Sequence, residues 1–118
     1  MDKEIKKKLA SNWFKLLQNI ICNDIEKLEN KKIKFKSKIW ERSKIKDEGG
    51  GEFRILRNGK VFEKVGVNFS EVRGKFSKEI REKIPGADKN PNFWASGISV
   101  VMHMNNPYIP AIHFNTRF

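Results

Sequence analysis

Two histidines lie ten residues apart near the carboxyl end of the chain, at His103 and His113, and the sequence contains no others. An imidazole can transfer a proton near neutral pH or coordinate a metal ion. Arg117 follows closely and offers a planar guanidinium that suits a carboxylate. Asn115 can donate and accept hydrogen bonds, and Ser99 can donate one to an anion. These side chains define a candidate site for an acidic ligand and for proton transfer.

The segment 93–103 alternates in a way that predicts a β-strand. One of its faces carries Ala95, Gly97 and Ser99 in succession, three of the smallest side chains, and ends at His103. The opposite face is mostly apolar and predicts a core side. A strand with so little side-chain volume on one face leaves room there for a flat ligand or for the close approach of another segment.

A second strand is predicted over residues 112–118, with His113, Asn115 and Arg117 on one face. Such a row is either an ordinary solvated surface or a ligand face, and the pattern alone favours the solvated surface. No third strong metal ligand is fixed by spacing, so a closed zinc site is poorly supported.

These strands need an element to pack against, and a long amphipathic helix is predicted from about residue 2 to residue 29. Neither Pro nor Gly interrupts it, and its apolar residues recur at spacings of three and four. We expect this stripe to pack on the core, with a membrane-surface helix as the alternative because Lys6, Lys7 and Lys8 cluster at one end. The stripe consists of Ile5, Leu9, Trp13, Leu16, Leu17, Ile20, Ile21, Ile25 and Leu28.

The middle of the chain predicts further strands. Residues 32–39 alternate as a half-exposed strand, and the three glycines at 49–51 favour a turn with close backbone approach over a phosphate loop. Asn58-Gly59 is the preferred pair for a two-residue type I′ hairpin, which would set Arg57 opposite Lys60. The hairpin then has apolar pairs on both faces, which indicates an antiparallel sheet covered on both sides. A short helix is expected over 77–83.

Composition sets the class of protein. The chain has 118 residues, 38% of them hydrophobic, which suits a single domain over residues 1–118. No apolar run is long enough for a membrane span, and a single cysteine, Cys22, favours a reducing cytoplasm. The net charge of +11 favours anionic partners. It leaves open a basic nucleic-acid-binding module, with lysines interleaved among apolar residues over 31–46, or a structural remnant that self-associates through a sheet edge.

Several motifs, in order along the chain from about residue 9 to the last residue, resemble those of the oxygen-dependent coproporphyrinogen III oxidases of haem biosynthesis. An ordered series of motifs is more specific than any one of them. The matching stretches are Trp40-Glu41-Arg42, the glycines at 49–51, residues 58–64, residues 66–70, Gly74, the alternating segment 93–103, Asn106-Pro107-Tyr108, Pro110, His113-Phe114-Asn115 and Arg117-Phe118.

The resemblance implies an enzyme that converts two propionates of a porphyrinogen to vinyl groups and gives protoporphyrinogen IX, with molecular oxygen and no organic cofactor. Ser99, Asn115 and Arg117 would contact the substrate, and His113 would be the proton donor. A divalent metal on His103 and His113 is implied by some descriptions of the family. On this likeness nucleic acid is not expected to be a partner.

The resemblance also implies an α+β fold: an antiparallel sheet flanked by helices on both faces, in homodimers. The family chain continues well beyond Phe118, so we expect an N-terminal part with an incomplete sheet. Such a part would have little or no activity alone, and would form a homodimer or associate with the missing C-terminal part.

Overall fold

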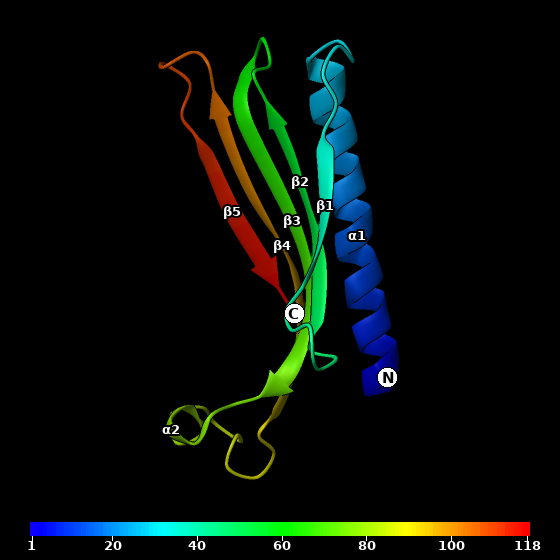
Figure 1. Ribbon diagram of the computed structural model, residues 1–118, viewed down its shortest axis with the longest axis vertical. Coiled ribbons are helices and arrows are strands. Elements are labelled where there is room, and N and C mark those ends of the chain that lie inside the picture. Colours follow the sequence, from blue (N-terminus) through cyan, green and yellow to red (C-terminus); the bar gives the residue numbers. More distant parts are fainter.

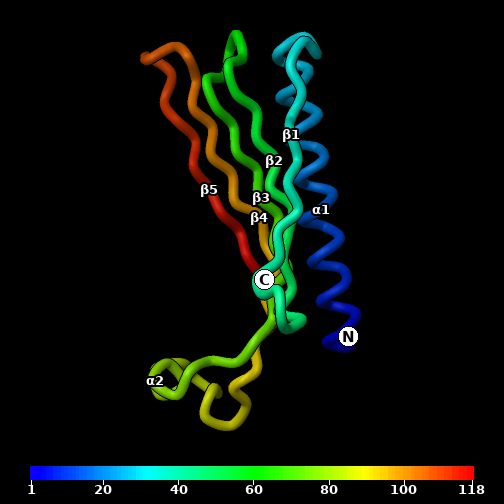
Figure 2. Tube along the Cα trace, viewed as in Figure 1, coloured from blue at the N-terminus to red at the C-terminus, as the bar shows by residue number.

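The computed structural model describes residues 1–118 and consists of a five-stranded antiparallel sheet with one long helix (Figures 1 and 2). The strands are ordered β1-β2-β3-β4-β5, so each pairs with its neighbours in sequence and the sheet is not closed. Along the chain the elements are α1 (Lys3–Leu28), β1 (Lys36–Glu41), β2 (Gly49–Arg57), β3 (Phe62–Lys75), α2 (Lys78–Arg81), β4 (Asn92–Met104) and β5 (Ile112–Arg117).

The predicted α+β class, the long N-terminal helix and the open antiparallel sheet are confirmed. Helix α1 lies along one face of the sheet, against β3 and β4, whereas no helix of this chain covers the other face (Figure 1). The expectation of helices on both faces is therefore met on one face only. The physical reason is that α2 is a single turn and lies beyond the end of the sheet.

Helix α1 begins where the sequence predicts, because the Asp2 side chain caps it by accepting a hydrogen bond from the backbone amide of Glu4. It ends before Asn30 and Lys31, which both adopt a left-handed backbone conformation. That turn delays β1 until Lys36, four residues later than predicted. Neither helix has the length and apolar character that crossing a bilayer requires.

The predicted packing of the α1 stripe is wrong for six of its members, which are 43–60% exposed: Ile5, Leu9, Trp13, Leu16, Ile20 and Leu28. The helix instead buries a face of mixed character, made of Ser11, Phe14, Gln18, Cys22 and Ile25.

Gln18 explains how a polar residue can lie at the centre of the helix–sheet contact. Its side-chain amide donates to the backbone carbonyls of Glu52, at 2.8 Å, and Val67, at 3.1 Å. A buried amide that makes both hydrogen bonds avoids the cost of desolvation without a partner. Because α1 has apolar residues on more than one side, spacing alone could not identify the side that faces the sheet.

The β2–β3 hairpin forms, but not in the predicted register. Arg57 pairs with Lys64 and not with Lys60, and the tip lies at Lys60 and Val61. Asn58 has a positive φ of 59°, but Gly59 does not, so the pair does not form a type I′ turn. The shift is by an even number of residues, so the faces predicted for the paired strands are kept. Phe62 is the exception, because the register is irregular between Phe62 and Lys64 and its side chain lies in the buried core.

Glu29, at the end of α1, fixes the position of this tip. Its carboxylate is only 4% exposed and accepts hydrogen bonds from the backbone amides of Lys60 (2.6 Å), Val61 (2.6 Å) and Phe62 (3.2 Å). The side-chain amide of Asn105 donates to the carbonyls at the same tip. These tertiary hydrogen bonds outweigh the local preference of the Asn-Gly pair.

Two smaller predictions are corrected in part. The glycines at 49–51 lie in β2 and not in a turn, although the expected close approach is present: a Cβ on Gly51 would collide with the carbonyl of Phe69 on the next strand. The short helix follows Ser77 as predicted but ends at Arg81.

We expect Glu52 to make folding stability depend on pH. Hydrogen bonds from Arg54 and, more weakly, from Ser37 lower the pKa of Glu52 below its usual 4.5. The unfolded chain therefore binds a proton at a higher pH than the folded chain, so this stabilisation is present above about pH 4.5 and is lost as the pH falls further. Urea unfolding at pH 7 and at pH 3 measures how much the free energy of unfolding falls between the two pH values. This decrease should be smaller for Glu52→Gln than for the wild type. For Glu63→Gln, at an exposed position without an ion pair, it should equal that of the wild type.

Candidate functional site

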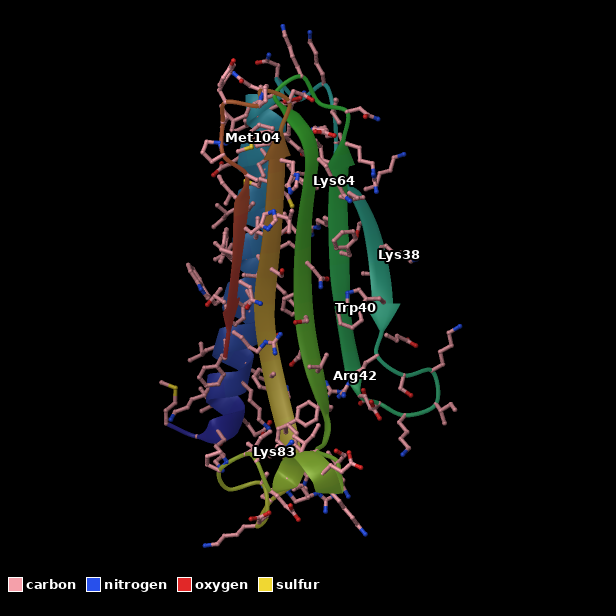
Figure 3. All side chains as sticks on the ribbon, turned by 90° about the vertical axis from the view of Figure 1, so that its left-hand side faces the viewer. Lys38, Trp40, Arg42, Lys64, Lys83 and Met104 are labelled. Atoms are coloured by element: carbon pink, nitrogen blue, oxygen red, sulfur yellow. The ribbon has the colours of Figure 1, made fainter.

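The face of the sheet opposite α1, here called the open face, brings together the predicted site residues. Strand pairing aligns Ser99 with Asn115 and Gly97 with Arg117, and the alternation along each strand points all four to the open face. Figure 3 views the molecule from this side, with α1 behind the sheet.

The register extends these pairs into three rows that cross the whole sheet. From β1 to β5 the rows are Trp40, Gly51, Ser70, Gly97 and Arg117; then Lys38, Phe53, Asn68, Ser99 and Asn115; then Lys36, Ile55, Gly66, Val101 and His113.

Two residues of β3 that were not among the predicted site residues also belong to the site. Asn68 lies beside Ser99, and Ser70 lies beside Gly97. With Asn115 and Arg117 they line a shallow hollow of about 70 Å³ on the open face. Their alternation in the segment 66–70 was a signal, but only strand pairing shows which residues lie beside them.

The indole of Trp40 orients Asn68. Its Nε1 donates to the side-chain oxygen of Asn68 at 3.0 Å, and Figure 3 shows Trp40 on the open face. The acceptor end of the Asn68 amide is thereby engaged, so its NH₂ group is left to donate to a ligand. Trp40 itself provides an aromatic surface at the β1 side of the hollow.

The floor of the hollow is low because the sheet leaves no space for larger residues there. A Cβ on Gly97 would lie 2.6 Å from the carbonyl oxygen of Thr116. The predicted face of small residues on β4 is thus present, and it continues onto β3 and β2 through Ser70 and Gly51.

The two histidines meet at one end of the open face. The Nε2 atoms of His103 and His113 are 2.9 Å apart, and the rings are stacked with centroids 5.1 Å apart. A hydrogen bond at this distance needs a proton on one nitrogen and a lone pair on the other, so the pair can pass a proton between its rings. Both rings are exposed, and His113 lies about 13 Å along β5 from Arg117.

The charged side chains in the rows of the open face are all positive. Lys36, Lys38 and Arg117 lie in its three rows, and Arg57 pairs with Lys64 on the same face, while none of these positions carries Asp or Glu. Figure 3 shows Lys38 and Lys64 on this side of the molecule. A cationic surface around neutral hydrogen-bond donors suits a ligand with several carboxylates.

Neither a metal site nor a thiol nucleophile is built by these residues. His103 and His113 supply two nitrogen donors, but no group of three or more metal-binding side chains occurs in the structure. The residues present therefore do not complete a protein metal site, for which three or four ligands are usual. Cys22 lies on the buried side of α1, and burial raises the pKa of its thiol to about 11, so it remains protonated at neutral pH.

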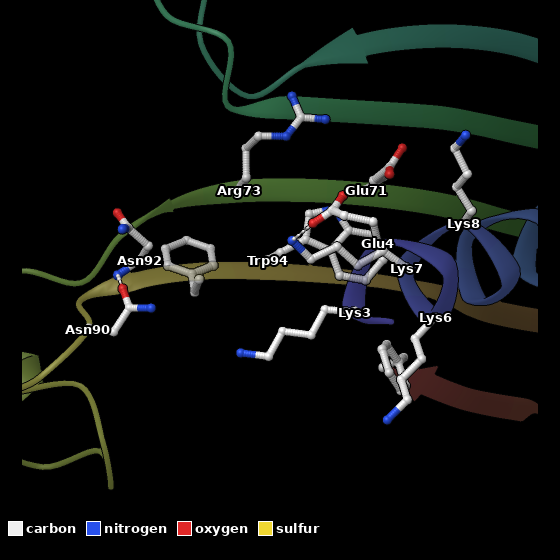
Figure 4. Close-up of a pocket in the computed structure, with 12 residues that line it drawn as sticks. Lys3, Glu4, Lys6, Lys7, Lys8, Glu71, Arg73, Asn90, Asn92 and Trp94 are labelled. Carbon is white, nitrogen blue, oxygen red and sulfur yellow. Dashed lines mark hydrogen bonds and ion pairs between the residues drawn. The ribbon is translucent and has the colours of Figure 1, made fainter. Parts of the chain in front are cut away.

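A larger hollow, of about 640 Å³, lies between the start of α1 and the ends of β3 and β4 (Figure 4). Its wall contains charges of both signs. Lys7 forms an ion pair with Glu4 at 3.1 Å and lies over the ring of Trp94. The predicted site residues do not line this hollow.

The family match and the similar proteins of this chain indicate the same family. The chain matches the family described as Coproporphyrinogen III oxidase over residues 9–118. A Rickettsia felis protein named oxygen-dependent coproporphyrinogen-III oxidase is 47% identical over 120 residues, which cover 95% of this chain. Proteins of the same name from Rickettsia akari and Rickettsia bellii are 46% identical over the same share. The chain spans 42% of the length of these relatives.

Proposed function

The chain belongs to the coproporphyrinogen III oxidase family, and we propose that its open face binds a porphyrinogen through the carboxylates of the substrate. The observation that carries this proposal is the convergence of Ser99, Asn115 and Arg117 on a shallow cationic face without carboxylates. Gly97 and Gly51 have no side chains, which leaves space above them for a flat macrocycle.

We propose the following roles. Arg117 binds a propionate with its guanidinium fork, Ser99 and Asn115 donate further hydrogen bonds, and His113 is the proton donor. His103 is within hydrogen-bonding distance of His113 and positions its ring. The reaction is the conversion of two propionates to vinyl groups, in which the carboxyl groups leave as carbon dioxide and molecular oxygen accepts the electrons. It gives protoporphyrinogen IX and uses no organic cofactor.

The named activity belongs to relatives more than twice as long as this chain, so we propose that the chain alone binds porphyrin with little or no turnover. Its working form is a homodimer or a complex with a chain that supplies the remaining family sequence. We place it in the cytoplasm, where the unpaired thiol of Cys22 is stable.

Binding of coproporphyrin III, the stable oxidised form of the substrate, tests this proposal. We expect the wild-type chain to quench or shift porphyrin fluorescence, and Arg117→Ala to weaken binding by roughly 10–100-fold, as the loss of a charge-assisted hydrogen bond implies. Arg73→Ala is the matched control, because Arg73 lines the other hollow and not the open face. No binding by the wild type, or an equal loss in both variants, would contradict the assignment.

A further inference from the structure

The outer side of α1 carries an apolar surface that no other part of this chain covers. We define it as the outer stripe: Ile5, Leu9, Trp13, Leu16 and Ile20, which are 43–55% exposed. Spacings of four, four, three and four align these residues along one side of the helix over about 22 Å. Contiguous exposed apolar patches of this kind usually mark interaction sites.

We propose that the outer stripe is the surface through which this chain binds an anionic lipid bilayer, with α1 lying in the plane of the membrane surface. Helix α1 is not apolar enough to cross a bilayer. A helix with an apolar stripe, lysines beside it and low overall hydrophobicity lies instead at the interface, with its apolar side among the headgroups and upper acyl chains. Trp13, at the centre of the stripe, suits this position because indole rings concentrate at the membrane–water interface.

The charges beside the outer stripe favour an anionic membrane. Lys6 and Lys8 lie on its two sides at the start of α1 (Figure 4), and Lys27 lies in line with it near the other end. All three are exposed, and none forms an ion pair within the chain. Asp24 is the one acidic residue on this side of the helix. Lysines at these positions can extend to lipid phosphates while the stripe itself is buried.

The position of α1 in the fold allows this contact. Gln18 lies on the side of the helix that faces the sheet, and Leu9 is about two and a half turns away, on the opposite side. The outer stripe can therefore enter the interface while α1 stays packed on β3 and β4. The open face lies on the other side of the sheet, so it points away from the membrane and stays accessible (Figure 3). The inference rests on α1 and not on the porphyrin chemistry.

Cosedimentation with lipid vesicles tests this proposal. We expect the chain to bind vesicles of equal parts phosphatidylglycerol and phosphatidylcholine, and to bind phosphatidylcholine alone much more weakly, because the lysines lose their attraction. Leu16→Glu should weaken binding to the anionic vesicles by roughly a hundredfold, because it removes a central apolar contact and places a negative charge beside anionic lipid. Ile45→Glu is the matched control and should bind like the wild type, since it adds the same charge in a loop where Ile45 is 94% exposed.

Quenching of tryptophan fluorescence by a brominated lipid tests the orientation separately. The three tryptophans of the chain are Trp13, Trp40 and Trp94, and only Trp13 belongs to the outer stripe. We expect brominated phosphatidylcholine in the anionic vesicles to quench the wild type and to quench Trp13→Phe much less. Trp13→Phe should still bind, because phenylalanine keeps most of the apolar contact. Equal quenching of the two proteins would show that another surface enters the bilayer.

Three results would overturn the proposal: no binding of the wild type to the anionic vesicles, undiminished binding by Leu16→Glu, or a dimer in solution that Leu16→Glu dissociates. The second result would assign lipid binding to the cationic open face, and the third would show that a protein surface covers the outer stripe. Circular dichroism establishes that each variant is folded. Leu16→Glu should still bind coproporphyrin III without vesicles, so failure of this proposal is distinguishable from failure of the proposed function.

Discussion

Replacing Glu29 by alanine is expected to lower the free energy of unfolding by about 3–5 kcal/mol. The carboxylate is buried and accepts three backbone hydrogen bonds from the tip of the β2–β3 hairpin. Alanine would leave those amides without their acceptor, and one hydrogen bond to a charged group is worth about 1.5–3 kcal/mol. Urea unfolding followed by circular dichroism measures the change.

Glu29→Gln provides a graded comparison, because it keeps one carbonyl oxygen as an acceptor but loses the charge. We expect a loss between those of the wild type and Glu29→Ala. Hydrogen exchange should show the local effect as faster exchange at the amides of Lys60, Val61 and Phe62. If the urea midpoint of Glu29→Ala equals that of the wild type, the carboxylate does not determine the position of the tip.

Gly97→Val is expected to lower the free energy of unfolding by about 2–3 kcal/mol and to abolish porphyrin binding. A Cβ at this position lies 2.6 Å from the Thr116 carbonyl oxygen and 3.3 Å from the Arg117 Cα. Backbone atoms cannot rotate away as a side chain can, so β5 would have to move from β4. The valine methyl groups would also fill the floor of the hollow. Urea unfolding and coproporphyrin fluorescence measure the two effects.

Ser99→Ala separates the two effects of the glycine substitution. Ser99 is exposed on the same strand and face, so its replacement should leave stability within about 0.5 kcal/mol of the wild type and weaken binding alone. A Gly97→Val variant with wild-type stability and binding would show that β4 and β5 do not approach as closely as the structure indicates.

Local periodicity was sufficient to predict most elements and the face of each site strand. The alternation around Ser99 and that around Asn115 both give the correct faces, since successive side chains of a strand point to opposite sides. The apolar periodicity correctly predicts that α1 starts near residue 2, and the structure shows that Asp2 caps this end. The predicted histidines do meet, but only the pairing of β4 with β5 brings two residues ten positions apart to 2.9 Å.

Local sequence patterns thus specify the class of fold, the long helix and the two faces of each site strand, because these features depend on neighbours within a few positions. Three features follow only from tertiary contacts: the side of α1 that faces the sheet, the position of the hairpin turn and the residues of β3 that complete the site. Each of those outcomes depends on a contact between distant parts of the chain: Gln18 with the carbonyl of Val67, Glu29 with the amide of Val61, and Asn68 with the indole of Trp40. Such hydrogen bonds form only once the elements have packed, so no local pattern specifies them.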